Sequence, residues 1–151
     1  MRLKDCHGFS DFRELARRRL PSPIFNYIDG AADDETTYDR NTKSFEECDL
    51  IPNVLRGVEN IDMSVTIMGQ KLDMPIYCSP TALQRVFHHS GEHAVAAAAD
   101  KFGTMFGVSS LGTVSLTEVR EQYNGPQCYQ FYFHKDRGLN QVMLELSLIH
   151  I

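Results

Sequence analysis

Polar side chains that could hold a ligand stand in two short apolar stretches of the sequence. Ser109 and Ser110 close one stretch, and Gln130 and Tyr132 lie in the next, over residues 127–133. A buried amide or hydroxyl is costly unless it finds a hydrogen-bond partner. A ligand with amide-like edges would satisfy Gln130, but bonds to neighbouring strands or to water would do the same, and the two serines could simply begin a loop.

A sharp turn at Pro80 offers a third candidate. Residues 74–79 are mostly apolar or small, which favours a short strand buried on both faces. Pro80 stops that strand, since it fixes its own φ and makes the preceding residue extended. Thr81 and Ala82 are small enough for a flat ligand to lie against the backbone, at the strand end where parallel α/β proteins bind ligands. A buried strand and turn without a ligand explain these residues equally well.

Histidines and cysteines indicate neither a metal centre nor a disulfide framework. His88 and His89 follow the turn, and no third ligand stands at metal spacing, so we expect a solvated pair. The cysteines lack paired spacing, which favours reduced thiols in a cytosolic compartment. Four are present: Cys6, Cys48, Cys78 and Cys128.

Composition and charge are those of an ordinary soluble protein, with 42% hydrophobic and 23% charged residues in 151. The net charge is −5 and the longest basic run, residues 17–19, is short, which argues against a nucleic-acid partner. No apolar run approaches the ~18 residues that cross a bilayer. Residues 1–5 lack the apolar core of a secretory signal.

Helical spacing predicts three helices over residues 10–49. The first is capped by Ser10 and ended by Pro21, and the second begins at Ser22 and stops at Gly30. The third follows acidic residues that favour a helix start. Its expected buried stripe is Tyr38, Asn41 and Phe45.

Beyond residue 50 the pattern changes to strands. Residues 62–73 resemble a hairpin that turns at Gly69. Strands are then expected near residues 76, 104 and 128, and each is followed by a helical pattern. Cap signals support these helices: Ser90 and Gly103 flank one, and a capping box from Ser115 to Glu118 opens another. The apolar stripe expected on the last helix is Leu139, Val142, Met143 and Leu146.

Alternating strands and helices imply parallel strands with right-handed crossovers. The repeat fits a (β/α)₈ barrel, which needs about 250 residues. We therefore predict an α/β fold, a partial TIM barrel in which residues 74–146 form the first three βα units after the helices and the hairpin. The alternative is a small open sheet that is complete as it stands.

Alternation of side chains assigns two faces to the stretch 127–133. One set would point into the barrel and the other would pack against helices. The inward set is Cys128, Gln130 and Tyr132, and the outward set is Tyr129, Phe131 and Phe133.

Several motifs in register resemble the FMN-dependent 2-hydroxy acid oxidases and dehydrogenases over residues 10 to about 145. The motifs are Phe25–Tyr27 with Gly30–Ala31 and Asp34–Glu35; Pro80–Gln84 with His88 and Gly91–Glu92; Val108–Ser110; and Tyr129–Tyr132 with Lys135–Arg137.

This resemblance implies a TIM barrel that carries FMN at the carboxyl ends of its strands. It implies that the turn after the first strand runs beside the reactive N5 of the flavin. The implied cofactor-binding residues are Pro80, Thr81, Ala82, Ser109 and Gln130. The implied substrate-binding residues are Tyr27, directed at the carboxylate, and Tyr132, a catalytic residue directed at the reacting hydroxyl.

Departures from the family pattern bear on substrate. Leu111 stands where glycolate-specific members carry tryptophan, so lactate or a longer 2-hydroxy acid is favoured over glycolate. Ile28 replaces a frequent second tyrosine, and His89 and Ser90 replace a common Pro-Glu pair at a helix start.

Other family features have no counterpart in residues 1–151: the base histidine, the carboxylate-binding arginine, a lysine beside the flavin and a phosphate-binding turn. Residues 147–151 depart from the family, so we interpret them as a tail, and His150 is not taken as the missing base. We expect this chain to be inactive by itself. One alternative is a non-catalytic piece with an apolar strand edge open to a partner; another is a different FMN-barrel chemistry, such as isomerisation.

For the full-length protein the resemblance implies oxidation of an L-2-hydroxy acid to the 2-oxo acid. Oxygen, a quinone or a cytochrome could accept the electrons. We expect a homo-oligomer when full length, in the cytoplasm, with peripheral inner-membrane association as a further alternative.

Overall fold

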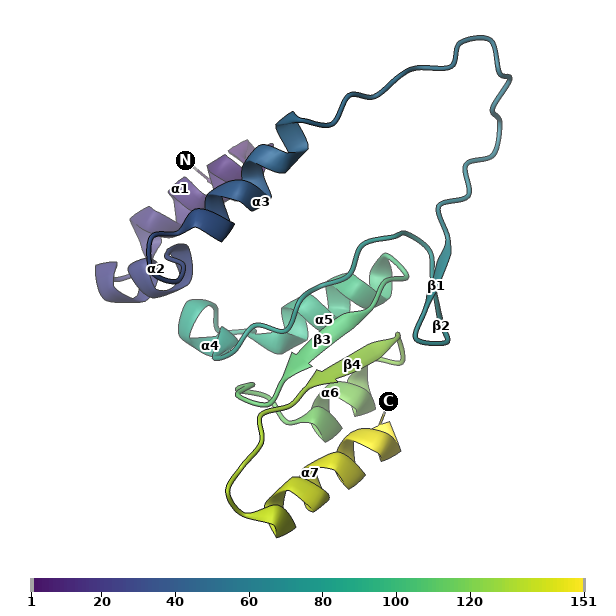
Figure 1. Cartoon of the computed structure of the whole chain (residues 1–151). Helices are drawn as coiled ribbons and strands as arrows, with labels where there is room; N and C mark the ends of the chain where they lie inside the picture. Colours follow the sequence, from purple (N-terminus) through teal and green to yellow (C-terminus); the bar gives the residue numbers. More distant parts are fainter. Residues whose placement is uncertain (1, 151) are drawn as a thin grey trace. The chain divides into compact units, whose positions relative to one another are not determined.

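The computed structural model describes residues 2–150, and Figure 1 shows their helices and strands. Contacts divide the chain after Glu59 into two compact units, which we call unit 1 and unit 2. Unit 1 contains only helices, and unit 2 contains all the strands found in the described residues.

Unit 1 holds the three expected helices and a short 3₁₀ turn. α1 begins earlier than expected, because the Asp11 carboxylate accepts hydrogen bonds from the backbone of His7 and Gly8 at 2.9 and 3.1 Å and makes Gly8 the N-cap instead of Ser10. The elements are η1 (Leu3–Asp5), α1 (Phe9–Arg19), α2 (Ser22–Asp29) and α3 (Thr36–Glu46).

The stripe expected on α3 is not buried. Phe45 is 83% exposed, Asn41 is exposed and Tyr38 is half-buried. The buried hydrophobic side chains of unit 1 are Leu15 on α1 and Phe25 on α2, so these two helices form its core and α3 adds nothing to it.

An ion pair ties α2 to α1. The Arg13 guanidinium donates to both carboxylate oxygens of Asp29, at 2.5 and 2.9 Å. This bidentate geometry is the strongest that arginine and a carboxylate can form. The hydrogen bond from Arg13 lowers the pKa of Asp29 below its usual value.

Unit 2 opens with the expected hairpin. β1 (Val65–Ile67) pairs antiparallel with β2 (Gln70–Leu72). Met68 and Gly69 both have positive φ, 52° and 77°, which is the turn whose twist suits a tight hairpin.

Parallel strands follow, as predicted. β3 (Phe106–Ser109) pairs parallel with β4 (Gln127–Gln130). The first expected strand, residues 74–79, lies along the other edge of β3 but joins it only through a parallel bridge between Cys78 and Phe106. The backbone bonds of Cys78 to Met105 (2.9 Å) and of Gly107 to Cys78 (2.8 Å) hold it there.

Burial of residues 74–79 on both faces was wrong. Ile76 and Tyr77 are exposed. Pro75 has no N–H for a ladder, and within residues 2–150 no strand pairs with the outer edge of this segment. With only one bridge to β3, the segment is not a regular strand.

The core of unit 2 lies between the sheet and two helices, α5 (Glu92–Lys101) and α6 (Leu116–Gln122), which cover one side of it (Figure 1). α4 (Gln84–Phe87) and α7 (Arg137–His150) complete the unit. The apolar stripe expected on α7 is largely exposed: Leu139, Val142 and Leu146 are exposed and Met143 is half-buried. The core cluster comprises Ala96, Ala99, Phe106, Val108, Val114 and Val119.

Helix caps agree with the sequence only in part. Gly103 has a φ of 59° just after α5, the left-handed conformation that suits a C-terminal cap. The Ser115 hydroxyl accepts from the Glu118 N–H at 3.1 Å. The Glu118 carboxylate, however, lies 3.0 Å from Nε2 of His93 on α5, so the box is half formed and its acid joins two helices instead. The N-cap of α5 is Gly91 and not the expected Ser90.

The described residues contain neither a membrane-spanning helix nor a group of metal ligands. None of their helices has the length and apolar content needed to cross a membrane. They contain no cluster of three or more histidine, cysteine or acidic side chains able to hold a metal ion.

Candidate functional site

The sheet face turned away from α5 and α6 carries the candidate polar residues. Phe106 and Val108 pack into the core, so alternation turns Ser109 to the opposite face. The register sets Gln130 directly beside Ser109 and Cys128 beside Gly107. The predicted inward direction of Gln130 therefore agrees with the sheet.

Ser109 and Gln130 are bonded to each other at the carboxyl ends of the two strands. Ser109 is only 6% exposed, and its hydroxyl donates to Oε1 of Gln130 at 3.2 Å. The same hydroxyl accepts from the Leu111 N–H at 3.2 Å. Gln130 thus uses its carbonyl oxygen within the chain.

The turn after Pro80 meets the same strand ends. A Cβ on Gly107 would lie 2.7 Å from Cδ of Pro80 and 2.8 Å from its nitrogen, so only glycine allows this approach. Just beyond the turn, the Leu83 N–H donates to the Leu111 carbonyl at 3.1 Å. Thr81 and Ala82, between these two contacts, are therefore held near the end of β3.

Two buried polar atoms beside these loops have no hydrogen-bond partner among the described residues. They are Oγ of Ser110 and Oε1 of Gln84, whose Nε2 donates to the Thr81 carbonyl at 3.2 Å. Unpaired buried polar atoms are rare in native proteins, and a missing ligand or water is a common reason.

Two ionisable neighbours of the candidate site are partly buried. Burial raises the pKa of the Cys128 thiol and of the Tyr129 phenol above their usual values. Burial therefore favours the protonated form of both groups.

Tyr132 lies beyond the strand that was expected to carry it. β4 ends at Gln130, because its partner β3 ends at Ser109, and Tyr132 is 55% exposed. Of the expected outward set, Tyr129 packs on the core and Phe131 contacts it with ring centroids 6.3 Å apart. Phe133 is exposed, so its predicted packing against helices was wrong.

Tyr27 belongs to unit 1. It lies on α2 between Phe25, which is buried, and Asp29, which is paired with Arg13; it is itself 67% exposed. A tyrosine on the apolar face of a helix is more often a core residue, but the Tyr27 side chain is exposed.

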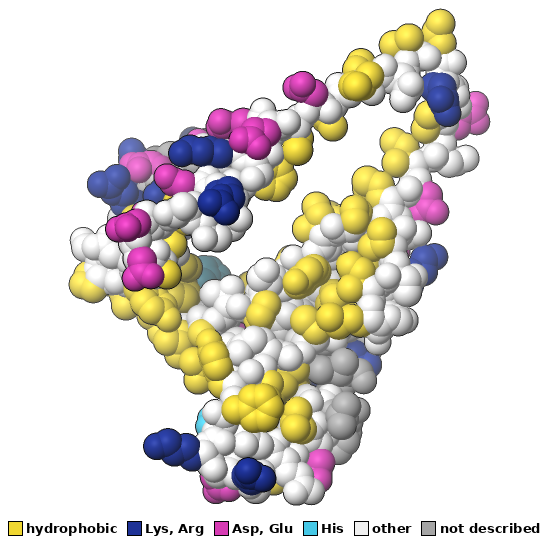
Figure 2. Space-filling view, in the orientation of Figure 1, with side chains coloured by type: hydrophobic (Ala, Val, Ile, Leu, Met, Phe, Trp, Pro, Cys, Tyr) yellow, Lys and Arg dark blue, Asp and Glu magenta, His cyan; other side chains and the backbone are white. Residues whose placement is uncertain are grey.

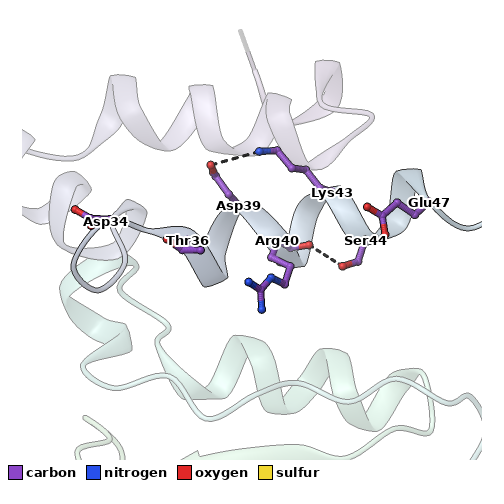
Figure 3. A pocket seen from close by; sticks show the side chains of 7 residues that line it. All are labelled: Asp34, Thr36, Asp39, Arg40, Lys43, Ser44 and Glu47. Atoms are coloured by element: carbon purple, nitrogen blue, oxygen red, sulfur yellow. Dashed lines mark hydrogen bonds and ion pairs between the residues drawn. The ribbon is translucent and has the colours of Figure 1, made fainter.

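A shallow depression on α3 is not a site. Figure 3 shows most of its side chains on successive turns of α3, with Asp34 on the loop before it, Asp39 and Lys43 paired at 3.7 Å and Ser44 bonded to the Arg40 carbonyl. Charges that pair along one exposed helix form a solvated face. The lining residues are Asp34, Thr36, Asp39, Arg40, Lys43, Ser44 and Glu47.

Glu92 is the residue that sequence analysis missed. The sequence placed it in a motif of the resembled family but assigned it no role. The side chain is 0% exposed and accepts two hydrogen bonds from Thr113. A buried carboxylate needs such partners.

The described residues of unit 2 form an α/β segment with polar side chains at the carboxyl ends of parallel strands, and comparison with known proteins gives the family. Residues 16–147 match the family model of FMN-dependent dehydrogenases, so the chain belongs to that family.

Curated relatives include an L-lactate dehydrogenase of Xanthobacter autotrophicus, 40% identical over 136 residues that make up 90% of this chain and 35% of that protein. A glycolate oxidase of Spinacia oleracea is 37% identical over 86% of this chain and 35% of its own length. The chain thus spans about a third of these relatives. Among solved structures, a soluble mutant of the membrane-associated (S)-mandelate dehydrogenase from Pseudomonas putida matches with a TM-score of 0.84 and 29% identity, over 94% of this chain and 40% of that one.

The residues present fit the flavin ring of FMN. A flavin edge offers carbonyl and ring-nitrogen acceptors and an N–H donor, and the strand ends offer the Gln130 amide, the Ser109 hydroxyl and the unpaired Ser110 hydroxyl. The close approach of Pro80 to Gly107 brings the small residues Thr81 and Ala82 beside them.

Proposed function

We propose that this chain is the flavin-ring part of a protein that oxidises an L-2-hydroxy acid to the 2-oxo acid with FMN. The observation that carries the proposal is the convergence of Thr81–Ala82, Ser109 and Gln130 at one end of a parallel sheet. Membership of the FMN-dependent dehydrogenase family supports it.

We propose further that the sheet is the beginning of a barrel. Figure 2 shows hydrophobic side chains gathered on the near face of unit 2, and Ile76, Tyr77 and Phe133 are among the exposed ones. β4 also has a free edge within the described residues. A sheet that helices cover on one side only, and that keeps a free edge, suits further strands and helices that close around it.

Each residue would have a separate task. FMN supplies the redox chemistry when bound, as a two-electron acceptor at its ring. Ser109 and Gln130 would hold the polar edge of the ring, and the backbone at Thr81 and Ala82 would form a flat surface against it. The hydroxyls of Tyr27 and Tyr132 would bind the substrate carboxylate and its reacting hydroxyl.

We propose a lactate-like substrate. Leu111 is exposed next to Ser109 and is smaller than tryptophan, which leaves room for a methyl group or a longer chain on the substrate. The relative of Xanthobacter autotrophicus, an L-lactate dehydrogenase, supports this choice.

Addition of L-lactate should bleach the visible flavin band of the whole protein that contains this chain. The experiment mixes the FMN-loaded protein anaerobically with L-lactate and follows absorbance, with D-lactate as the stereochemical control. Tyr132→Phe should slow bleaching by roughly tenfold or more, since one hydrogen bond to the reacting group is lost. If no short L-2-hydroxy acid bleaches the flavin, the proposed function is wrong.

The 151-residue chain by itself should show negligible turnover and weak FMN affinity, because the base and phosphate-binding residues of the family have no counterpart in it. The measurement is a flavin fluorescence titration followed by an L-lactate assay with an artificial electron acceptor. Turnover by the purified chain at even a hundredth of the whole protein's rate, on the order of a 3 kcal/mol difference in barrier, would contradict this expectation.

We propose a cytoplasmic homo-oligomer as the working state. The cytoplasmic location is supported by the free state of all four cysteines. Peripheral association with the inner membrane is the alternative, since the Pseudomonas putida relative is described as membrane-associated. Oxygen, a quinone and a cytochrome stay the candidate electron acceptors.

A further inference from the structure

A fully buried carboxylate lies behind the proposed flavin-facing loops. Glu92, in the first turn of α5, is 0% exposed. Its Oε1 accepts from the Thr113 N–H at 2.7 Å and its Oε2 accepts from the Thr113 hydroxyl at 2.6 Å. A charged acceptor with two short bonds fixes one residue of a loop more firmly than neutral hydrogen bonds do.

Thr113 connects this carboxylate to the other loop. Its Oγ1 donates to Glu92 and also accepts from the Arg85 N–H at 3.2 Å. Thr113 belongs to the loop after β3, and Arg85 belongs to the segment after the Pro80 turn. One hydroxyl therefore bridges the two loops through the buried acid.

Further hydrogen bonds join the same two loops at positions nearer to the candidate site. The Leu83 N–H donates to the Leu111 carbonyl at 3.1 Å, and the Leu111 N–H donates to the Ser109 hydroxyl at 3.2 Å. A shift of Thr113 would thus be passed to Ser109 through Leu111. It would also reach Thr81, whose carbonyl accepts from Gln84.

We propose that Glu92 and Thr113 are positioning residues that clamp the loops 81–85 and 109–113 together, so that the flavin ring meets one preformed surface. The inference rests on the proposed function for its flavin part. The clamping of the two loops is a property of this chain and does not depend on the flavin.

The bridge requires a carboxylate and a hydroxyl. Glutamine at position 92 has one acceptor oxygen where two are used, and valine at position 113 keeps the shape of threonine but removes both bonds of Oγ1. Serine at position 113 keeps the hydroxyl. Thr66 on β1 is exposed and lies outside the network, so Thr66→Val is the matched control.

Amide hydrogen exchange of the 151-residue chain tests the clamp. Thr113→Val and Glu92→Gln should speed exchange at least tenfold in peptides covering 81–85 and 109–113, whereas Thr113→Ser and Thr66→Val should stay within threefold of the unmodified chain. β3 is the internal reference. If β3 exchanges equally fast in Thr113→Val, the variant has unfolded as a whole, and Thr113→Ser decides: wild-type-like protection supports the clamp, and loss of protection overturns it. Unchanged exchange in 81–85 also overturns it.

The flavin part is tested in the FMN-loaded whole protein. Thr113→Val should raise the dissociation constant for FMN at least tenfold and alter the shape of the visible flavin band, and Thr113→Ser should restore both. If hydrogen exchange shows the clamp but Thr113→Val leaves FMN binding unchanged, the flavin part of the inference is overturned. Absence of FMN binding by the unmodified whole protein overturns the proposed function instead, and the exchange result still decides the clamp.

Discussion

Gly107→Ala should lower the free energy of unfolding of unit 2 by about 3 kcal/mol, the upper part of the range for overpacking a closely packed interior. The added Cβ would lie 2.7 Å from Cδ of Pro80, 2.8 Å from its nitrogen and 3.0 Å from the Cys78 carbonyl oxygen. Two of these atoms belong to the backbone, so relief requires that residues 78–80 move away from β3. Urea unfolding followed by circular dichroism measures the effect.

The control for this prediction is Gly8→Ala. A Cβ on Gly8 has nothing within 4 Å, so the same chemical change should cost only the loss of a favourable N-cap, about 1 kcal/mol or less. Because the Gly107 variant moves the Pro80 turn, it should also weaken FMN binding in the whole protein. Equal stability of the two variants would show that the contact of Pro80 with Gly107 is not a constraint.

Acid should selectively remove the stability that Glu92 contributes. Burial alone would raise the pKa of Glu92, but hydrogen bonds from the Thr113 hydroxyl and N–H and from the backbone of Glu92 and Gln84 together outweigh it and hold the pKa below the usual 4.5. The folded state therefore binds the proton less tightly than the unfolded state. The contribution is complete above about pH 4.5 and is lost as the pH falls through the lower folded-state value.

Glu92→Gln makes this contribution measurable. At neutral pH the variant should be less stable by about 3 kcal/mol, typical for hydrogen bonds to a buried charge. The difference in unfolding free energy between Glu92→Gln and the unmodified chain should become smaller as the pH is lowered to about 3. Glu121→Gln, at an exposed position on α6, is the control, and its unfolding free energy should stay close to that of the unmodified chain at every pH tested. If the stability difference caused by Glu92→Gln does not change with pH, the Glu92 carboxylate is not the source of this pH-dependent stability.

Local signals in the sequence were sufficient where one turn decides the structure. The hairpin at Gly69, the cap at Gly103 and the helix stop before Pro21 depend on residues whose backbone preferences are strong, and all three are confirmed. The placement of Ser109 and Gln130 at the same end of the sheet also followed from strand order, because parallel strands set their carboxyl ends at one edge, whereas their hydrogen bond to each other was not predicted.

Expectations about burial were less successful, because burial depends on neighbours and not on spacing. Phe45 and Leu139 have the correct helical period, yet both are exposed. Residues 74–79 have the composition of a strand buried on both faces, but Ile76 and Tyr77 in this segment are exposed. An apolar stripe predicts which face prefers burial. It does not supply the surface that covers it.

Glu92 was missed for a related reason. A glutamate in the first turn of a helix is ordinarily explained by the dipole, and nothing local indicates that its partner lies 21 residues later. The threonine of that later loop could have been suspected only from the strand order, which folds the loop after β3 back on the start of α5.

The parallel pairing of neighbouring strands also affects how the chain acquires its structure during synthesis. Ser109 and Gln130 are separated by 21 residues, and Thr104 bonds to a carbonyl 28 residues earlier, so each strand meets its predecessor after a short crossover. The entropy of closing such loops grows only slowly with their length. Each new strand and helix can therefore dock on the preceding pair as they leave the ribosome, one unit at a time, with no need to wait for a distant part of the polypeptide.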